Sequence, residues 1–122
     1  VDALAASAPR FAGWGLAVAQ ALVEGPLEVA VLGRPGEDGT TVLHRTALAG
    51  TSPGLVVAFG PPAGAGTDDQ PDVVPLLRDR PLVGDRPTAY VCRGFVCELP
   101  STAPDDLGRR VGGRVPVPAE HA

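Results

Sequence analysis

LEVAVLGRPGEDGTTVLHRTALAGTSPGLVVAF, residues 27–59, contains the clearest structural pattern of this chain. It begins with Leu27–Leu32, an almost continuous apolar run of strand length, and ends with a second apolar run, Leu55–Phe59. Such runs are typical of strands that are covered on both faces. Between them, Thr40–Ala49 has the apolar spacing of a short helix, and Thr40 is a suitable N-cap. A strand, a helix and a strand in this order predict a right-handed crossover that joins two parallel strands.

A β-hairpin is predicted further along the chain at Thr88–Pro100, where the sequence is TAYVCRGFVCELP. We favour a two-residue loop at Arg93-Gly94, because glycine tolerates a positive φ. The alternation of side chains then places five residues on one face of the hairpin: Tyr90, Cys92, Phe95, Cys97 and Leu99. Of these, we expect Tyr90, Phe95 and Leu99 to form the core of the hairpin.

The register of this hairpin determines whether Cys92 and Cys97 can form a disulfide. With the loop at Arg93-Gly94, the two cysteines are diagonal neighbours about 7–8 Å apart. That distance exceeds the Cα separation of an undistorted disulfide. With a loop that spans Arg93–Val96, the cysteines are directly opposite one another and a disulfide is feasible. The sequence allows both registers and mildly favours the tighter turn.

Four roles are considered for Cys92 and Cys97. Free thiols packed as small apolar residues are favoured, since free cysteine is among the most buried residue types. A disulfide, permanent or redox-responsive, comes second. A metal site comes third, because only His44 and His121 could complete a set of four ligands. A thioredoxin-type pair is least favoured, because its cysteines are two residues apart at a helix N-terminus. We expect neither a metal nor a cofactor.

Two more helices complete the predicted architecture. The first has its apolar pattern over Phe11–Val23, with Ser7 as its N-cap and Pro9 in its first turn. Its apolar residues recur at spacings of three and four: Phe11, Trp14, Val18 and Leu22. We expect this face to pack against the core or a neighbouring domain. A capping-box pattern at Thr102–Asp105 predicts a last helix that ends near Val111. The fold class is therefore α/β, with a small, mostly parallel sheet, flanking helices and a C-terminal β-hairpin.

The composition excludes several classes of function. A net charge of -4 argues against a general nucleic-acid binder. No apolar run approaches the ~20 residues of a membrane-spanning helix, and no secretory signal is recognised, so we expect a cytoplasmic protein. The chain contains no Met, Ile, Lys or Asn, which indicates a high-G+C bacterial genome. Without an initiating Met, we expect the chain to begin inside a longer protein. No catalytic constellation is recognised.

Several segments together resemble a known family. They match in chain order: Leu27–Gly33, Leu55–Gly60, Pro75–Leu77, Thr88–Pro100 and Asp105–Leu107. These segments look like the C-terminal region of the thioredoxin-domain-containing family that includes the spermatogenesis-associated thioredoxin-like protein. The resemblance implies a parent protein with an N-terminal thioredoxin-like domain and a central six-hairpin α/α barrel, similar to sugar epimerases and glycosidases. The family's redox cysteines and sugar pocket belong to those two parts, so no catalytic residue is carried over.

The resemblance also implies a domain organisation and a role. We expect residues 1–25 to be a helix from, or packed on, the preceding barrel. Residues 26–111 would form the small α/β domain, and 112–122 a flexible tail. The domain would be a non-catalytic structural or interaction module whose partners are other domains of the parent chain. Two alternatives are a thiol redox-responsive element at Cys92 and Cys97, and an accessory part of a carbohydrate-active enzyme.

Overall fold

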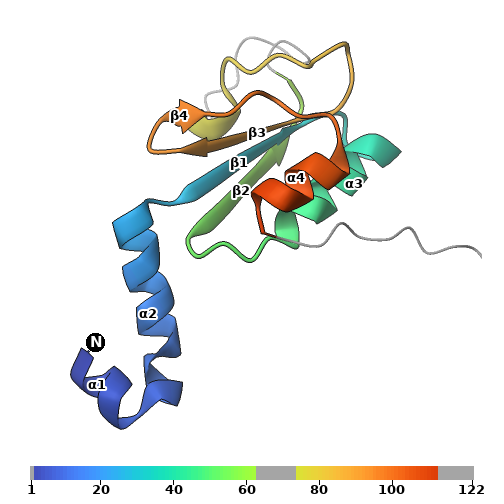
Figure 1. Cartoon of the computed structure of the whole chain (residues 1–122). Helices are drawn as coiled ribbons and strands as arrows, with labels where there is room; N and C mark the ends of the chain where they lie inside the picture. The colour runs from blue at the N-terminus through green and yellow to red at the C-terminus, as the bar shows by residue number, and fades with distance from the viewer. Residues whose placement is uncertain (1, 63–73, 113–122) are drawn as a thin grey trace, which may run out of the picture.

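The computed structural model describes residues 2–62 and 74–112, so the predicted tail lies outside the described residues except for Gly112. Its elements, in chain order, are α1 (Asp2–Ser7), α2 (Pro9–Glu24), β1 (Leu27–Leu32), α3 (Asp38–Leu48), β2 (Leu55–Gly60), the 3-10 helix η1 (Pro75–Leu77), β3 (Thr88–Arg93), β4 (Val96–Cys97) and α4 (Pro104–Arg110). Helices α1 and α2 form an N-terminal arm that extends away from the layered sheet domain (Figure 1). None of the described helices is long and apolar enough to cross a bilayer.

The four strands form one mixed sheet with the order β2-β1-β3-β4. The predicted β1–α3–β2 unit is confirmed, and β1 and β2 are parallel from Leu27↔Leu55 to Leu32↔Gly60. Helix α3 begins at Asp38 with Glu37 as its N-cap, so Thr40 lies inside the helix and the predicted cap is wrong. The prediction of a mostly parallel sheet is wrong, because β3 runs antiparallel to β1. Strand β3 begins with Thr88 beside Leu32, the last residue of β1. A strand that starts where its neighbour ends runs back along it without a crossover.

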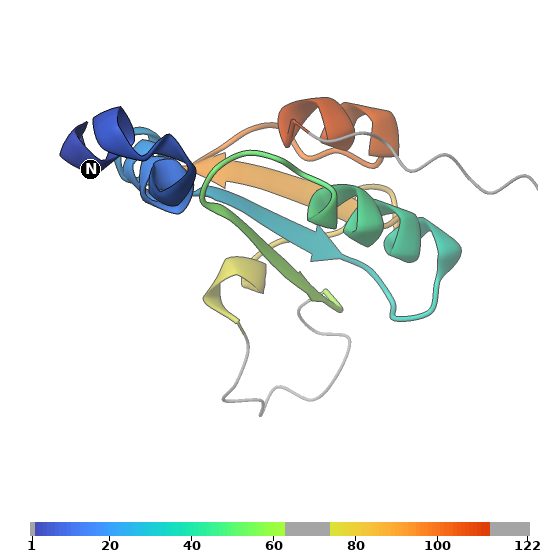
Figure 2. The ribbon, with the colours of Figure 1, turned by 90° about the horizontal axis from the view of Figure 1, so that it is seen from below.

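Strand β1 lies in the middle of the sheet and is covered on both faces, as its apolar sequence predicts (Figure 2). Helices α3 and α4 cover one face, and the buried cluster there contains Leu27, Val29, Val31, Leu43, Ala47, Ala89, Val91, Leu107 and Val111. On the opposite face, Leu77 of η1 packs on Ala30 and Leu32. Strand β2 lies at an edge, so its predicted burial is only partial, and Val56 is 49% exposed.

Helix α2 begins at Pro9, so Pro9 lies in its first turn as predicted, but its N-cap differs from the prediction. Proline suits the first turn of a helix, where its missing N–H costs no hydrogen bond. The N-cap is Ala8, because Ser7 still belongs to α1 and its hydroxyl donates to the carbonyl of Ala3 at 2.9 Å. The predicted last helix exists as α4, and its N-cap is Ala103.

The turn of the hairpin is one residue later than predicted. Arg93 pairs with Val96, so the two loop residues are Gly94 and Phe95, with φ of 55° and 67°. Two consecutive positive φ values characterise a type I′ turn, which matches the twist of a tight hairpin. The favoured loop at Arg93-Gly94 is therefore wrong, and the alternative register places Cys92 opposite Cys97.

Candidate functional site

Cys92 and Cys97 form a disulfide bond with an S–S distance of 2.06 Å. The favoured interpretation as free packed thiols is therefore wrong. The amide of Glu98 donates to the carbonyl of Val91 at 2.9 Å, so the cysteines occupy the adjacent non-hydrogen-bonded pair. Residues at such positions approach more closely than those of a hydrogen-bonded pair, and the two Cα atoms are 3.9 Å apart. The shift of the turn thus brings the two sulfur atoms together.

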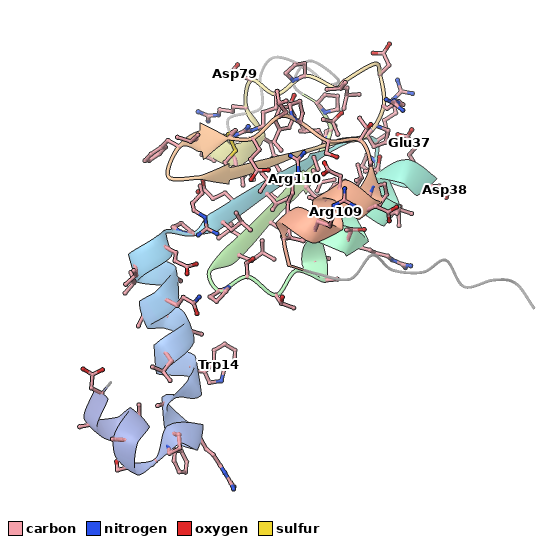
Figure 3. The ribbon with its side chains drawn as sticks, viewed as in Figure 1. Trp14, Glu37, Asp38, Asp79, Arg109 and Arg110 are labelled. Atoms are coloured by element: carbon pink, nitrogen blue, oxygen red, sulfur yellow. A yellow bond between two sulfur atoms is a disulfide. The ribbon has the colours of Figure 1, made fainter. Side chains whose placement is uncertain are left out.

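The two ends of the disulfide differ in exposure. Cys92, in β3, is only 2% exposed. Cys97, in the two-residue edge strand β4, is exposed to solvent. A pocket of about 260 Å³ lies against the disulfide, and its lining comprises Glu28, Pro75, Leu76, Arg80, Cys92, Phe95 and Cys97. Figure 3 shows the sulfur–sulfur bond beside β4.

Arg80 is the charged neighbour of Cys97, the exposed cysteine. Its Nη1 donates a hydrogen bond to Sγ of Cys97 at 3.4 Å. Its Nε donates to the carbonyl of Leu76 at 2.6 Å, and its guanidinium carbon lies 5.1 Å from the centre of the Tyr90 ring. The Tyr90 hydroxyl in turn donates to the carbonyl of Pro81 at 2.6 Å. Arg80 is therefore held against Cys97 by its contacts with the backbone and an aromatic ring.

Sequence reasoning missed Arg80 entirely. It lies 17 residues before Cys97, in a segment between η1 and β3 that has no periodic pattern. Nothing in that segment distinguishes Arg80 from Arg78 or Arg86, since only the fold determines which guanidinium reaches the sulfur.

Two of the three predicted hairpin core residues are not in the core of the described chain. Tyr90 is partly buried and packs against the cluster beneath η1. Phe95 is fully exposed at the tip of the turn, and Leu99 is 83% exposed. The reason is the register: Phe95 is a loop residue instead of a strand residue, and β4 ends at Cys97.

The apolar face of α2 is exposed and does not pack on the core formed by the described residues. Phe11 is 81%, Trp14 88% and Leu22 80% exposed, and Val18 is more than half exposed. The Trp14 ring projects outward from the arm (Figure 3). Beside it, a pocket of about 350 Å³ is lined almost entirely by apolar atoms of Trp14, Ala17, Val18, Ala21, Leu22, Pro26 and Gly54.

The junction of the arm with the sheet is held by polar contacts. The Nη1 atom of Arg93 donates to the carbonyls of Glu24 and Gly25 at 3.3 and 2.6 Å. These carbonyls lie at the C-terminal end of α2, where helical backbone acceptors lack partners within the helix. Arg93 thereby joins the end of the arm to β3, next to the disulfide.

A second charged cluster joins α4 to the segment after β4. Arg110 pairs with Asp106 at 2.6 Å and with Glu98 at 3.2 Å. The Ser101 hydroxyl, together with the positive charge of Arg110, holds the pKa of Asp106 below its ordinary value. Because these groups stabilise one another at the surface, we assign the cluster a structural role.

The described residues contain no group of three or more His, Cys, Asp or Glu that could hold a metal ion. His44 stacks on the ring of Phe59 with 4.6 Å between the ring centres, and His121 lies outside the described residues. Both sulfur atoms are bonded to each other, so the interpretation of Cys92 and Cys97 as metal ligands does not apply to this state.

The fold and these features define a small α/β domain that carries a hairpin disulfide and an apolar helical arm. No family model, curated protein or solved structure matches the chain. The resemblance to the thioredoxin-domain-containing family therefore stays a prediction.

Proposed function

We propose that this chain is a non-catalytic interaction domain that docks onto a helical domain of its parent chain through the apolar face of α2. The observation that carries the proposal is the exposure of Phe11, Trp14 and Leu22, each at 80% or more, on one helix. Contiguous apolar surfaces of this kind mark sites where proteins bind one another.

The composition of α2 supports a helix that is covered by other protein on most of its surface. Its only polar side chains are Arg10, Gln20 and Glu24. Leu16 and Val23 lie on the side opposite the main stripe and are also exposed, at 46% and 87%. A helix that is apolar around most of its circumference is normally buried in a larger protein.

Helices are the partner that fits this surface best. The stripe repeats at the three- and four-residue spacing that interlocks with the ridges of another helix. Ala17 and Ala21 line the pocket beside Trp14, and their small side chains allow a partner helix to approach closely. The six-hairpin α/α barrel expected from the family resemblance would offer such a surface. Helices that bind anionic membranes carry a basic polar face, whereas Arg10 is the only cation of α2.

Amide hydrogen exchange can test the docking in the parent protein. Within the parent protein, we expect the amides of residues 9–24 to exchange more slowly than in the isolated chain, because a bound partner stabilises the helix. Trp14 is the only tryptophan of the chain, so its fluorescence reports independently on the isolated domain. It should be accessible to a soluble quencher there.

Matched variants separate docking from general destabilisation. Leu22→Glu places a charge on the stripe and should restore rapid exchange of α2 in the parent protein. Leu48→Glu, at an exposed position of α3, should leave that exchange unchanged. Equal exchange of residues 9–24 in the parent protein and the isolated chain would refute the proposal. If the amides of residues 9–24 are protected only when the protein self-associates, the partner is a second copy of the chain instead of a domain of the parent protein. If they are protected only on lipid vesicles, the partner is a membrane.

A further inference from the structure

We propose that Cys92–Cys97 is a reversible thiol–disulfide exchange site in which Cys97 is the reacting sulfur, Cys92 is the resolving sulfur and Arg80 is the positioning residue. This inference rests on the hairpin and its pocket, and it does not depend on what the arm binds.

The difference in exposure assigns the two cysteines their roles. An external sulfur must reach the disulfide along the S–S axis, and Cys97 is exposed at the sheet edge whereas Cys92 is 2% exposed. Exposed disulfides are the labile ones, while buried structural disulfides resist exchange. The pocket beside the bond leaves room for a reacting thiol next to Arg80 and Phe95.

Arg80 supplies the charge that such a site needs. A thiolate, rather than a thiol, is the attacking species, and adjacent arginine favours it. The Nη1 atom of Arg80 already contacts Sγ of Cys97 in the disulfide, at 3.4 Å. Glu28 lies opposite Cys92 on β1, so the negative charge of the pocket faces the buried cysteine. The two charges therefore favour a thiolate at Cys97 over one at Cys92.

The exchange is balanced with a disulfide as oxidant and a dithiol as reductant. On oxidation, the Cys97 thiolate attacks one sulfur of the external disulfide, and the other sulfur leaves with the electron pair and takes up a proton. Cys92 loses its proton and attacks Sγ of Cys97, which releases the second external thiolate. Two electrons pass from the protein to the external disulfide. Reduction by a dithiol retraces these steps: attack on Cys97 expels Cys92, and the second thiol of the reductant then expels Cys97.

A mapping experiment on the unmodified chain tests the assignment directly. The oxidised protein is treated with reduced glutathione, quenched with acid, alkylated and digested with trypsin. Cleavage after Arg93 separates the two cysteines into different peptides. We expect glutathione on the peptide that contains Cys97, and the alkylated thiol on the peptide that contains Cys92. Glutathione predominantly on Cys92, or equally on both, would overturn the roles.

Single-cysteine variants compare the reactivity of Cys97 with that of Cys92 in the oxidising direction. Reduced Cys92→Ser protein should form a mixed disulfide with glutathione disulfide at least roughly tenfold faster than Cys97→Ser protein, because Cys97 is exposed and lies beside a cation. A circular dichroism spectrum of each variant, compared with that of the reduced unmodified chain, verifies that the variant is folded. A disulfide that stays closed in excess dithiothreitol until the domain unfolds would identify a purely structural bond and refute the proposal.

Arg80→Gln isolates the role of the guanidinium. In the Cys92→Ser background it should slow the reaction of Cys97 by roughly threefold to tenfold, and Arg80→Lys should restore part of the rate. Arg93→Gln is the matched control, because it removes the same charge from a residue next to Cys92 whose guanidinium contacts the arm. Equal effects of Arg80→Gln and Arg93→Gln would show that only net charge matters and would remove Arg80 from the site.

Discussion

At Phe95 the backbone adopts a φ of 67° although the residue is neither glycine nor asparagine. The left-handed region costs an ordinary L-residue roughly 1–2 kcal/mol, because Cβ approaches the following carbonyl oxygen. The fully exposed side chain recovers none of this cost through packing in the described chain. The register with opposed cysteines therefore comes with an unfavourable turn residue.

Phe95→Asn should stabilise the domain by about 1 kcal/mol, because asparagine adopts a positive φ more readily and no buried contact is lost. Thermal unfolding of the oxidised protein measures the effect. Val96→Asn is the control: Val96 is a strand residue, so the same new side chain should lower the midpoint. A lower midpoint for Phe95→Asn would mean that the Phe95 ring makes a stabilising contact.

This turn also shows what a sequence can and cannot reveal at the scale of residues. Gly94 indicates a tight hairpin, but glycine is acceptable at either loop position, so the register is ambiguous by one residue. Preference for an unstrained turn selects Arg93-Gly94, whereas the observed loop is Gly94-Phe95. The partner of Cys97 follows from that register, and the contact with Arg80 depends on the path of a distant loop. The local preferences of the hairpin residues therefore predict neither the partner of Cys97 nor its contact with Arg80.

At the scale of elements, the close contact between β1 and α3 depends on Gly33. A Cβ at this position would collide with the side chain of Thr40, which is buried in the first turn of α3. The Thr40 hydroxyl donates to Oε2 of Glu37 at 3.3 Å, so it cannot move without loss of this contact. Gly33 thus has a packing role.

Gly33→Ala should lower the free energy of unfolding by about 1–3 kcal/mol, since the extra carbon forces α3 away from the sheet. Gly13→Ala provides the contrast, because a Cβ at Gly13 in α2 meets nothing within 4 Å. There, alanine favours the helix over glycine by roughly 0.5–1 kcal/mol. Denaturant unfolding should show a lower midpoint for Gly33→Ala only. A neutral Gly33→Ala variant would contradict the packing role.

The elements themselves were predictable where the pattern is local. Apolar periodicity indicates α2 and α3, a capping-box pattern indicates α4, and continuous apolar runs indicate the first two strands. The crossover rule orients β1 and β2 correctly. The direction of β3 was not predictable, because an apolar strand pattern is identical for parallel and antiparallel pairing. The mixed sheet results from where the chain returns after η1, and that path runs through irregular segments.

At the scale of the whole molecule, the core and the arm are separate. Both buried clusters consist of residues between Leu27 and Val111. Within residues 2–62 and 74–112, the arm meets the sheet domain only near its end. There Arg93 holds the carbonyls of Glu24 and Gly25, and Ala21 lies close to Gly54. The folding of the sheet domain should therefore not require most of the arm.

Deletion of residues 1–19 should leave the unfolding midpoint of the sheet domain nearly unchanged and should make the domain more soluble, because exposed apolar side chains are removed. Leu107→Ala in the full chain is the contrasting variant. Leu107 is completely buried, so its truncation should cost about 2–5 kcal/mol. Circular dichroism melts of the two proteins provide the comparison. Unfolding of the shortened chain would show that the arm contributes to the core.

The way the arm joins the sheet has a mechanical consequence. Helix α2 continues through Gly25 and Pro26 directly into β1, and every residue of β1 has a partner on each side. A tensile force on the arm therefore acts on the central strand, whose hydrogen bonds along both edges share the load. An edge strand in the same place would peel away one bond at a time. A force that pulls on α2 is therefore transmitted to β1, which is paired on both edges and resists extraction more than an edge strand would.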